Sequence, residues 1–555
     1  MRGFQWSRRG FAQGAMAALA AGCAGRGAPD LILHGGPIYT GAAGQGPVEA
    51  LRLSGGRVAF AGPLSDAQAN ARGAQRIDLA GAAAFPGFVD AHVHLGGVGM
   101  AAMTLDLVGV ESVAALQERL RAYSAAHPQG PIYGRGWIET HWPERRFPNA
   151  ADIDAIVDER PVLLERVDGH AAVANTGALR LAAIDANTRD PDGGRIERDS
   201  SGAATGMLID RAAELVQTRF PPPSAAQRRE AMAAAVQLYA SRGWVGAGNM
   251  STSLEEAQIL QDLAANEALP LFVDVYLTPE DSPAVYDRGP YADPSGLVRV
   301  RGVKLYMDGA LGSRGAALLA PYQDAPGEGL LVTPVETVRD FLARARTRGI
   351  QVATHAIGDR GNRLVLDAYR DTFADDAAAL RAARWRIEHA QVIAPEDLPR
   401  FAAMGVVASM QPSHAISDLH FAPARLGADR LAGAYAWQSL ARSGAVLAAG
   451  SDAPVEKGDP LIEFYAAAVR RDLAGFAGPD WRAEEALSRA EALKMLTWGP
   501  AYASFQENDR GTLEVGKRAD VSVFSTDLMT AAPDTIPVAK PMLTIAGGRV
   551  THNAL

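Results

Sequence analysis

The chain has 555 residues, of which 48% are hydrophobic and 21% are charged, proportions typical of a soluble globular protein. This length allows one large domain plus a smaller one, and the composition excludes a mainly disordered chain. The net charge is -9, and the lysines and arginines are scattered, so the chain lacks the basic surface that nucleic-acid binding requires. We therefore expect no nucleic-acid partner.

The first 28 residues have the pattern of an export signal. Arg2, Arg8 and Arg9 precede an Ala/Gly-rich apolar run over 11–22 that is too short to span a bilayer as a mature helix. The segment around Arg8 and Arg9 resembles the twin-arginine signal, an export route that carries folded proteins. We expect an exported bacterial protein with residues 1–28 as signal peptide and linker.

Cys23 is the only cysteine in the sequence, which excludes internal disulfides and multi-cysteine metal sites. It follows Leu19-Ala20-Ala21-Gly22, a run that resembles a bacterial lipobox with its leucine one position too far from the cysteine. Two locations are therefore expected. A lipid on Cys23 would anchor the protein to the membrane, whereas simple cleavage would release it into the periplasm.

Short apolar segments between glycines occur at both ends of the remaining chain, and they predict small strands joined by tight turns. Neither end has enough strands to be stable alone. We expect residues 29–84 and 505–555 to pair into one composite β-sandwich, with the larger domain inserted between them.

Between these ends, apolar strand-like runs alternate with helical stretches, which is the pattern of a parallel α/β fold. Eight such runs predict a TIM (β/α)8 barrel over residues 85–504, with strands at Ala84–Asp90, Trp244–Asn249, Leu271–Leu277, Val303–Met307, Gln351–Thr354, Trp385–Glu388, Val406–Met410 and Val446–Ala449. About 150 residues separate the first two strands, far more than a βα loop holds. An inserted subdomain is therefore expected at about 97–242.

The first barrel strand runs into a His-x-His pair. Alternation along a strand places His92 and His94 on one face, where two imidazoles can bind one metal ion. Imidazole suits Zn, Fe, Ni or Cu, so the pair indicates a metal without selecting it. Two ordinary strand histidines remain the alternative until further ligands are found.

Lys304 lies on the fourth predicted strand, in Gly302-Val303-Lys304-Leu305-Tyr306. An ammonium has no lone pair for a metal, so one interpretation is a lysine that pairs with Asp308 or with an anionic substrate. The other interpretation is that CO2 adds to the neutral amine. The resulting carbamate has two oxygens and could bridge two metal ions.

His355, His389 and Asp452 each follow a later strand, at the end of the barrel where active sites lie. Together with His-x-His, the two histidines favour a metal cluster over isolated polar residues. Asp452 can bind metal and transfer a proton, which is general acid-base catalysis. Its alternative role is that of a helix N-cap.

With these residues in place, the chain resembles the amidohydrolase superfamily, and within it the amidohydrolase-3 branch related to YtcJ and N-substituted formamide deformylase. The resemblance covers nearly everything after the signal segment and rests on ordered motifs: PGFVDAHVHL, VKLYMDGALGSRGAALLAPY, THAIGDRGN, RIEHAQ, MQPSH, GSDAPVE and GTLEVGKRADVSVF. One departure is the second strand, Gly246–Met250, where relatives often carry an aspartate.

The resemblance implies one or two divalent metal ions, with zinc as the first choice. His92, His94 and Asp452 would hold one ion, His355 and His389 the other, and a carbamate on Lys304 would bridge them.

The implied reaction is hydrolysis of a carbon-nitrogen bond other than a peptide bond, in a small amide-like substrate. A metal-activated hydroxide attacks the carbonyl, and Asp452 passes the proton to the departing nitrogen. Hydrolysis of an ester or lactone would use the same groups and is the nearest alternative. Ring deamination fits less well, because deaminase members usually keep one metal and lack the lysine.

Substrate contacts are expected from the insertion and the long loops. The resemblance offers four residues of the insertion as pocket walls, although simple packing explains a tryptophan equally well: Trp137, Arg166, Asp168 and His170. Asp308 and Arg314 could orient a polar group or brace their loop, and His414 and His420 could face the pocket without binding metal.

Two other functions stay open. The chain could be a surface-anchored binding lipoprotein that lost turnover, although all six expected metal and acid-base positions are occupied. It could also be a metal-free barrel enzyme with Lys304 as a Schiff-base nucleophile, but four strand-end histidines would then lack a purpose. The oligomeric state is open, and a homodimer is one option.

Overall fold

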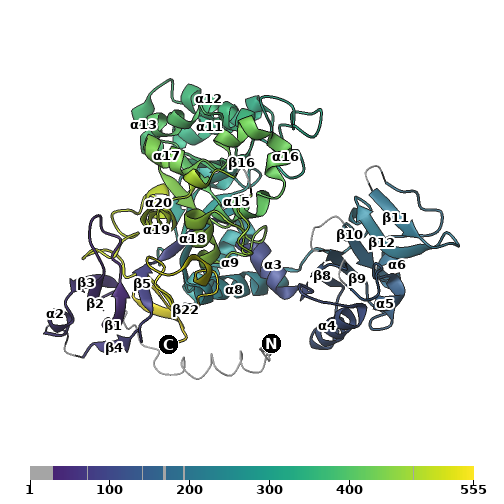
Figure 1. The fold of residues 1–555 in the computed structure, drawn as a ribbon, viewed down its shortest axis with the longest axis horizontal. Coiled ribbons are helices and arrows are strands. Elements are labelled where there is room, and N and C mark those ends of the chain that lie inside the picture. Colours follow the sequence, from purple (N-terminus) through teal and green to yellow (C-terminus); the bar gives the residue numbers. More distant parts are fainter. Residues whose placement is uncertain are drawn as a thin grey trace.

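Eight parallel strands form the centre of the molecule (Figure 1). The computed structural model describes residues 29–555 except 70, 72, 140–141, 167–170, 192–193 and 479–480, so the expected signal segment and Cys23 lie outside the described residues. Neighbouring strands pair in chain order: β6 (Phe88–Val93), β13 (Trp244–Thr252), β14 (Phe272–Leu277), β16 (Val298–Tyr306), β17 (Gln351–Ala356), β18 (Arg386–His389), β19 (Val407–Met410) and β20 (Leu447–Ala449).

The first and last of these strands lie side by side. Backbone hydrogen bonds join them just past their carboxyl ends. The backbone N–H of Asp452 donates to the carbonyl of His92 at 2.7 Å, and that of His94 donates to the carbonyl of Ala453 at 2.9 Å. These bonds bring the ends of β6 and β20 together. The predicted TIM barrel is confirmed.

Helices surround the barrel, and local sequence sets their ends. The helix α8 begins at a capping box between Ser224 and Gln227 and ends at Gly243, whose φ of 100° is available to glycine at low cost. The helices of the barrel domain are α3 (Leu95–Met103), α8 (Ala225–Arg242), α9 (Leu254–Ala265), α10 (Pro283–Arg288), α11 (Val335–Arg348), α12 (Asp359–Thr372), α13 (Ala377–Ala383), α14 (Leu398–Met404), α15 (Pro412–Asp418), α16 (Ala422–Leu426), α17 (Trp437–Ser443), α18 (Pro460–Val469), α19 (Arg489–Leu496) and α20 (Trp498–Ala503).

Strands from the two chain ends join in one eight-stranded sheet beside the barrel, with dark early strands next to yellow late ones in Figure 1. The early strands β1 and β5 connect to the late strands through an antiparallel pairing of β5 with β21. The members are β1 (Leu31–Ile38), β2 (Val48–Ser54), β3 (Arg57–Gly62), β4 (Gln75–Asp78), β5 (Ala83–Pro86), β21 (Val521–Phe524), β22 (Pro541–Ala546) and β23 (Arg549–Asn553), with the short helix α2 (Leu64–Ala69).

The strand expected at Ala84–Asp90 is two strands, because the chain changes sheets at Gly87. A Cβ at Gly87 would lie 2.4 Å from the Val245 side chain, so the crossing needs glycine. The Gly87 N–H donates to the Asp520 carbonyl at 2.8 Å, which ties the crossing to the late part of the chain. The periodicity of an apolar run does not reveal such a division.

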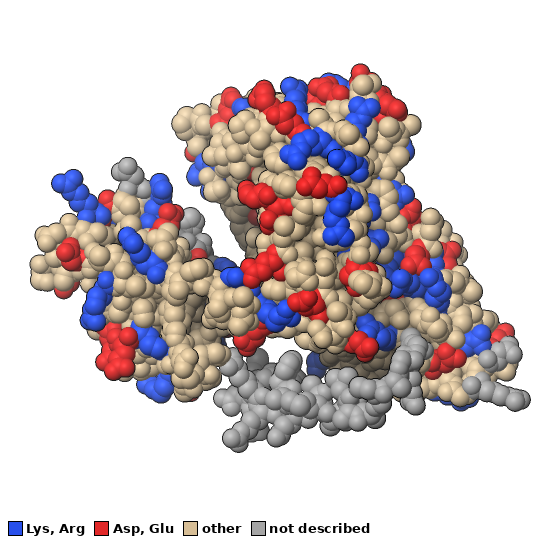
Figure 2. Space-filling model, turned by 180° about the vertical axis from the view of Figure 1, so that it is seen from behind, with Lys and Arg blue, Asp and Glu red and all other residues tan. Residues whose placement is uncertain are grey.

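A subdomain between α3 and α8 stands apart from the barrel, and Figure 2 shows a deep gap between the two parts on the face in view. It has its own six-stranded sheet and its own hydrophobic core. Although α8 falls within the range expected for the insertion, it packs on α3 and the barrel core. The subdomain contains β7 (Leu105–Asp106), β8 (Ile132–Trp137), β9 (Val162–Arg166), β10 (Ala171–Ala174), β11 (Gly194–Arg198), β12 (Ala204–Asp210), α4 (Val113–Ala126), α5 (Ala150–Asp154), α6 (Thr176–Leu181) and α7 (Glu214–Gln217).

Acidic and basic side chains alternate over the visible face, without a large patch of one sign (Figure 2). In the described part of the chain, no helix has both the length and the apolar character that a bilayer crossing requires.

The junction between the composite sheet and the barrel contains three aromatic rings that pack edge-to-face or tilted against one another. Phe524 on β21 packs on Phe88 of β6 with ring centroids 5.3 Å apart, and on Phe85 at 6.2 Å. We expect Phe524→Ala to lower the free energy of unfolding by about 3–5 kcal/mol, because it leaves a cavity in this core. Urea unfolding followed by circular dichroism measures the loss.

Val538→Ala is the matched control, because Val538 is 74% exposed and its truncation should change stability by less than about 0.5 kcal/mol. Equal effects of the two substitutions would show that the aromatic junction does not hold the two parts together.

Candidate metal centre

Histidines and an aspartate meet at the carboxyl ends of the barrel strands. His92 lies in β6, His355 in β17, and His389 ends β18. The ring centroids of His92 and His389 are 4.8 Å apart, and those of His355 and His389 are 4.5 Å apart. Because parallel strands end at the same face of the barrel, residues far apart in sequence form one cluster.

Asp452, three residues after β20, lies at the middle of this cluster. Its Oδ1 is 3.3 Å from His92 Nε2 and 3.1 Å from His94 Nε2. Ligand atoms of His92, His389 and Asp452 all lie within 4.8 Å of one another, and the three residues are buried. The structure therefore brings these three together most closely, with His94 and His355 beside them.

Several polar atoms of the cluster are buried without a hydrogen-bond partner: His92 Nε2, His355 Nε2 and Asp452 Oδ1. Leaving one such atom unpaired costs about 1–3 kcal/mol. Three unpaired atoms in one cluster therefore indicate a bound partner that is not a protein group. Imidazole nitrogens and carboxylate oxygen form the donor set of Zn and related ions. The residues present fit a divalent metal.

Other side chains fix the orientation of the metal-facing histidines. His92 Nδ1 bonds to Glu388 Oε2 at 2.7 Å, and His389 Nδ1 bonds to Gln411 Oε1 at 2.8 Å. His94 Nδ1 bonds to the Met250 carbonyl at 3.1 Å. Because each acceptor binds a protonated Nδ1, the lone pair of each Nε2 is available to a metal.

Glu388 is charged even though it is fully buried. Burial raises the pKa of this carboxyl, but the charge of Arg386 and the hydrogen bond from His92 outweigh burial and hold the pKa at about 2. Arg386 Nε donates to Glu388 Oε1 at 2.7 Å. Sequence reasoning missed the role of Glu388, although its position directly before His389 was a usable signal.

Lys304 on β16 is 1% exposed, and within the described residues its amine has no hydrogen bond or ion pair. Its Nζ lies 4.4 Å from the centroid of the Tyr306 ring. The pairing of Lys304 with Asp308, one of the two interpretations of its sequence, is absent from the described contacts. Asp308 instead accepts backbone N–H bonds from three residues: Ala317, Ile357 and Gly358.

The remaining candidates for substrate contact occupy different places. Arg314 forms an ion pair with Asp324 at 2.9 Å, which braces its loop. His414 lies beside the cluster, with its Nε2 3.7 Å from Asp452 Oδ2. His420 pairs with Asp472 at 3.1 Å and is half-exposed. Of these, only His414 lines the cavity above the cluster.

Trp137 and Arg166 belong to the inserted subdomain. The Trp137 ring is fully buried in that subdomain's own core, and its Nε1 donates to the Leu164 carbonyl at 2.8 Å. Arg166 pairs with Glu139 at 2.8 Å. Packing of the subdomain therefore accounts for Trp137, and Asp168 and His170 lie outside the described residues.

A cavity of about 420 Å³ opens above the cluster. Helix α15, the residue before α16, the loop after β16 and the loop after Asp452 supply its outer walls. Beyond the metal-facing residues, the lining consists of Tyr306, Ala310, Leu311, Gly312, Ile357, Gln391, His414, Asp418, Phe421, Val455 and Glu456.

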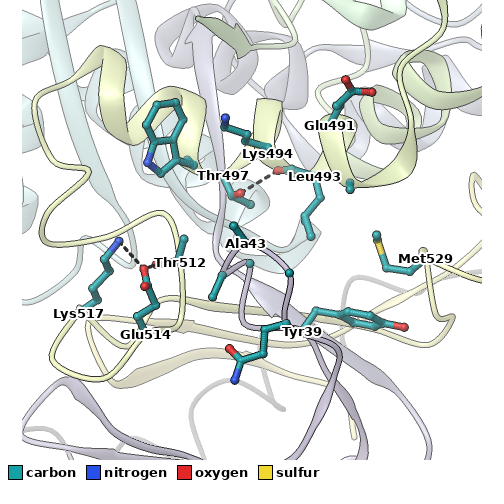
Figure 3. A pocket seen from close by; sticks show the side chains of 16 residues that line it. Tyr39, Ala43, Glu491, Leu493, Lys494, Thr497, Thr512, Glu514, Lys517 and Met529 are labelled. Atoms are coloured by element: carbon teal, nitrogen blue, oxygen red, sulfur yellow. Dashed lines mark hydrogen bonds and ion pairs between the residues drawn. The ribbon is translucent and has the colours of Figure 1, made fainter. Parts of the chain in front are cut away.

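A second cavity, of about 570 Å³, lies between the composite sheet and helices α19 and α20 (Figure 3). Gly499 of α20 packs against Leu447 at the start of β20, so this cavity lies toward the opposite end of the barrel from the histidines. Its charged side chains include Lys494 and the ion pair of Lys517 with Glu514 at 3.1 Å. It lacks the histidine cluster and is not the candidate metal centre.

Comparison with known proteins agrees with this geometry. The amidohydrolase family profile matches residues 75–552. YtcJ of Bacillus subtilis (strain 168) is 32% identical over 541 residues, covering 94% of this chain and 99% of that protein. N-substituted formamide deformylase of Arthrobacter pascens is 27% identical, covering 94% and 97%.

Among solved structures, an uncharacterized metal-dependent hydrolase from Pyrococcus horikoshii OT3 superimposes with a TM-score of 0.75 at 28% identity, covering 91% of this chain and 99% of that one. A second uncharacterized metal-dependent hydrolase, from Pyrococcus furiosus, superimposes with a TM-score of 0.74 at 30% identity. This match covers 90% of this chain and 100% of that one. From its barrel, its cluster of histidines and aspartate, and these matches, the chain belongs to the amidohydrolase family of hydrolases.

Proposed function

We propose that this protein hydrolyses an amide-type carbon-nitrogen bond of a small molecule, with Asp452 as general acid and base. The observation that carries the proposal is the buried, unpartnered set of His92 Nε2, His355 Nε2 and Asp452 Oδ1 at the carboxyl ends of the barrel strands. His92, His94 and Asp452 would hold one divalent ion, and His355 and His389 would hold a second.

The burial of Lys304 without an ion pair supports a site for two metal ions. A buried ammonium without an anion is costly, whereas a neutral amine can add CO2 and become an anionic carbamate with two oxygen ligands. We propose this modification on Lys304, with zinc as the ion. When bound, the metal supplies a Lewis acid for the carbonyl oxygen and lowers the pKa of water.

The protein's own groups carry the proton. The Asp452 carboxylate is buried in the cluster and takes the proton as the oxygen of water joins the acyl carbon. The carbon-nitrogen bond then breaks, and Asp452 returns that proton to the departing nitrogen, so the products are an acid and an amine. His414 Nε2, which lies 3.7 Å from Asp452 Oδ2 without a hydrogen-bond partner, is placed to donate to the substrate.

The test of function is amine release from N-formyl and N-acetyl amides by zinc-loaded protein. Asp452→Asn should reduce kcat by at least about 100-fold, because it removes the acid-base group. Asp534→Asn, at an exposed position, is the control and should leave kcat unchanged. Absence of amide hydrolysis by the parent protein, or hydrolysis only of matched esters, would contradict the proposal.

Glu388→Gln should weaken zinc binding by about 10–100-fold, because a neutral amide orients His92 less strongly than a carboxylate does. Competition with a chromophoric chelator measures the Kd. The matched control is Glu507→Gln, which neutralises a partly buried glutamate paired with Arg384 at 2.6 Å.

Thermal unfolding of both variants without metal separates a binding effect from general instability. An unchanged Kd in Glu388→Gln, or an equal loss in both variants, would show that Glu388 does not position a metal ligand.

A further inference from the structure

The outer half of the cavity above the metal centre carries acidic groups that the hydrolytic reaction does not use. Asp418 ends α15, and Glu456 follows Asp452 by four residues in the neighbouring loop. Val455, beside Glu456, is 70% exposed, which places this part of the lining at the mouth. The two carboxylates therefore face the end of the cavity through which a substrate enters.

Both carboxylates are held in place. Ser417 Oγ donates to Glu456 Oε1 at 2.6 Å, and the Tyr435 hydroxyl donates to Asp418 Oδ2. Burial raises the pKa of Asp418 to about 6, and the nearby charge of Glu456 adds to that rise. Two fixed carboxylates that disfavour each other's charge are stabilised by a cation placed between them.

The described residues bring no lysine or arginine to this part of the cavity. Among the described residues that line the cavity, Lys304 is the only lysine and none is an arginine, and Lys304 lies at the strand ends with the histidines. Arg314 and Arg425, the arginines next to the Gly312 and Phe421 walls, both pair with Asp324. A carboxylate on the outer end of a substrate would thus meet two like charges and no partner.

An independent feature indicates that the cavity is built for a polar ligand. The Gln391 amide nitrogen, which can only donate, lies 2.9 Å from His414 Nδ1, so His414 Nε2 carries the ring hydrogen. His414 is 7% exposed, lines the cavity, and its Nε2 has no acceptor. The acyl oxygen of an amide would complete this hydrogen bond.

We propose that the substrate is an N-acyl compound whose outer end carries a cationic ammonium-type group, recognised by Glu456 and Asp418. This inference rests on the proposed hydrolase function. The apolar walls from Leu311, Ile357 and Phe421 suit the short hydrocarbon chain between the amide and the cation. Glu456 and Asp418 act as specificity residues, apart from the metal ligands.

The test uses zinc-loaded protein and three acetamides of similar length that differ at the outer end: N-acetylcadaverine with an ammonium, N-pentylacetamide with a methyl group, and N-acetylaminocaproate with a carboxylate. We expect kcat/KM to fall in that order, with the ammonium compound at least about 10-fold above the carboxylate compound. Equal values, or a preference for the carboxylate, would overturn the inference.

Substitutions at Glu456 identify the residue responsible. Glu456→Gln should remove most of the ammonium preference through KM and leave N-pentylacetamide unaffected, whereas Glu456→Lys should favour the carboxylate compound, a gain that misfolding cannot produce. Glu484→Gln, at a side chain 60% exposed beside Arg482, is the control and should change nothing. An unchanged preference in both Glu456 variants would contradict the assignment.

A failure of the hydrolase function is distinguishable from a failure of this inference. If the metal-loaded protein cleaves none of the three compounds or their N-formyl counterparts, the hydrolase proposal is wrong. Protection from thermal unfolding then decides the inference. Stronger protection by N-acetylcadaverine than by N-pentylacetamide supports a cation site, and equal protection overturns it.

Discussion

Arg386 and Glu388 lie two positions apart on β18 and form an ion pair inside the barrel, where both side chains are almost completely buried. Arg386 also donates to the Ala91 carbonyl and to the Ser409 hydroxyl, so it connects β18 with β6 and β19. A buried ion pair of this kind is stable only when further hydrogen bonds satisfy its remaining groups. Here Glu388 Oε2, which also accepts from Arg386 at 3.1 Å, orients His92, so the ion pair inside the barrel also positions a candidate metal ligand.

The backbone at the strand ends is adapted to this cluster. His389 has φ of 74° and Asp452 has φ of 56°, in the left-handed region that residues with side chains rarely adopt. Such conformations persist where surrounding structure enforces them, and they occur often at functional sites. The hydrogen bond from the Asp452 N–H to the His92 carbonyl, at 2.7 Å, provides that enforcement and places the carboxylate among the histidines.

Much of the fold and the cluster could be predicted from sequence, because a residue that directly follows an apolar run is expected at the end of a strand. His92, His389 and Asp452 each follow an apolar run, and parallel strands bring their ends to one face. The division of the first run at Gly87 could not be predicted, since it depends on contact with Val245 and Asp520, far away in the chain. For the same reason, the role proposed for Glu456 emerges only when distant elements pack together.

The role of residues in the inserted subdomain could not be predicted from the sequence. No sequence pattern tells whether a tryptophan in a long segment lines a pocket or packs in a core. The structure places Trp137 in the core of the subdomain. The groups that line the outer cavity come instead from α15, from Phe421 before α16 and from the loop after Asp452. In the proposed function, metal chemistry and substrate recognition would thus be carried by different parts of the same barrel face.

Anomalous diffraction from crystals of the zinc-loaded protein, grown with bicarbonate, tests the central claim most directly. We predict strong zinc peaks between His92, His94 and Asp452 and beside His355 and His389, with extra density on Lys304 Nζ between them. A protein without zinc at these strand ends, or with zinc bound only elsewhere, would contradict the account.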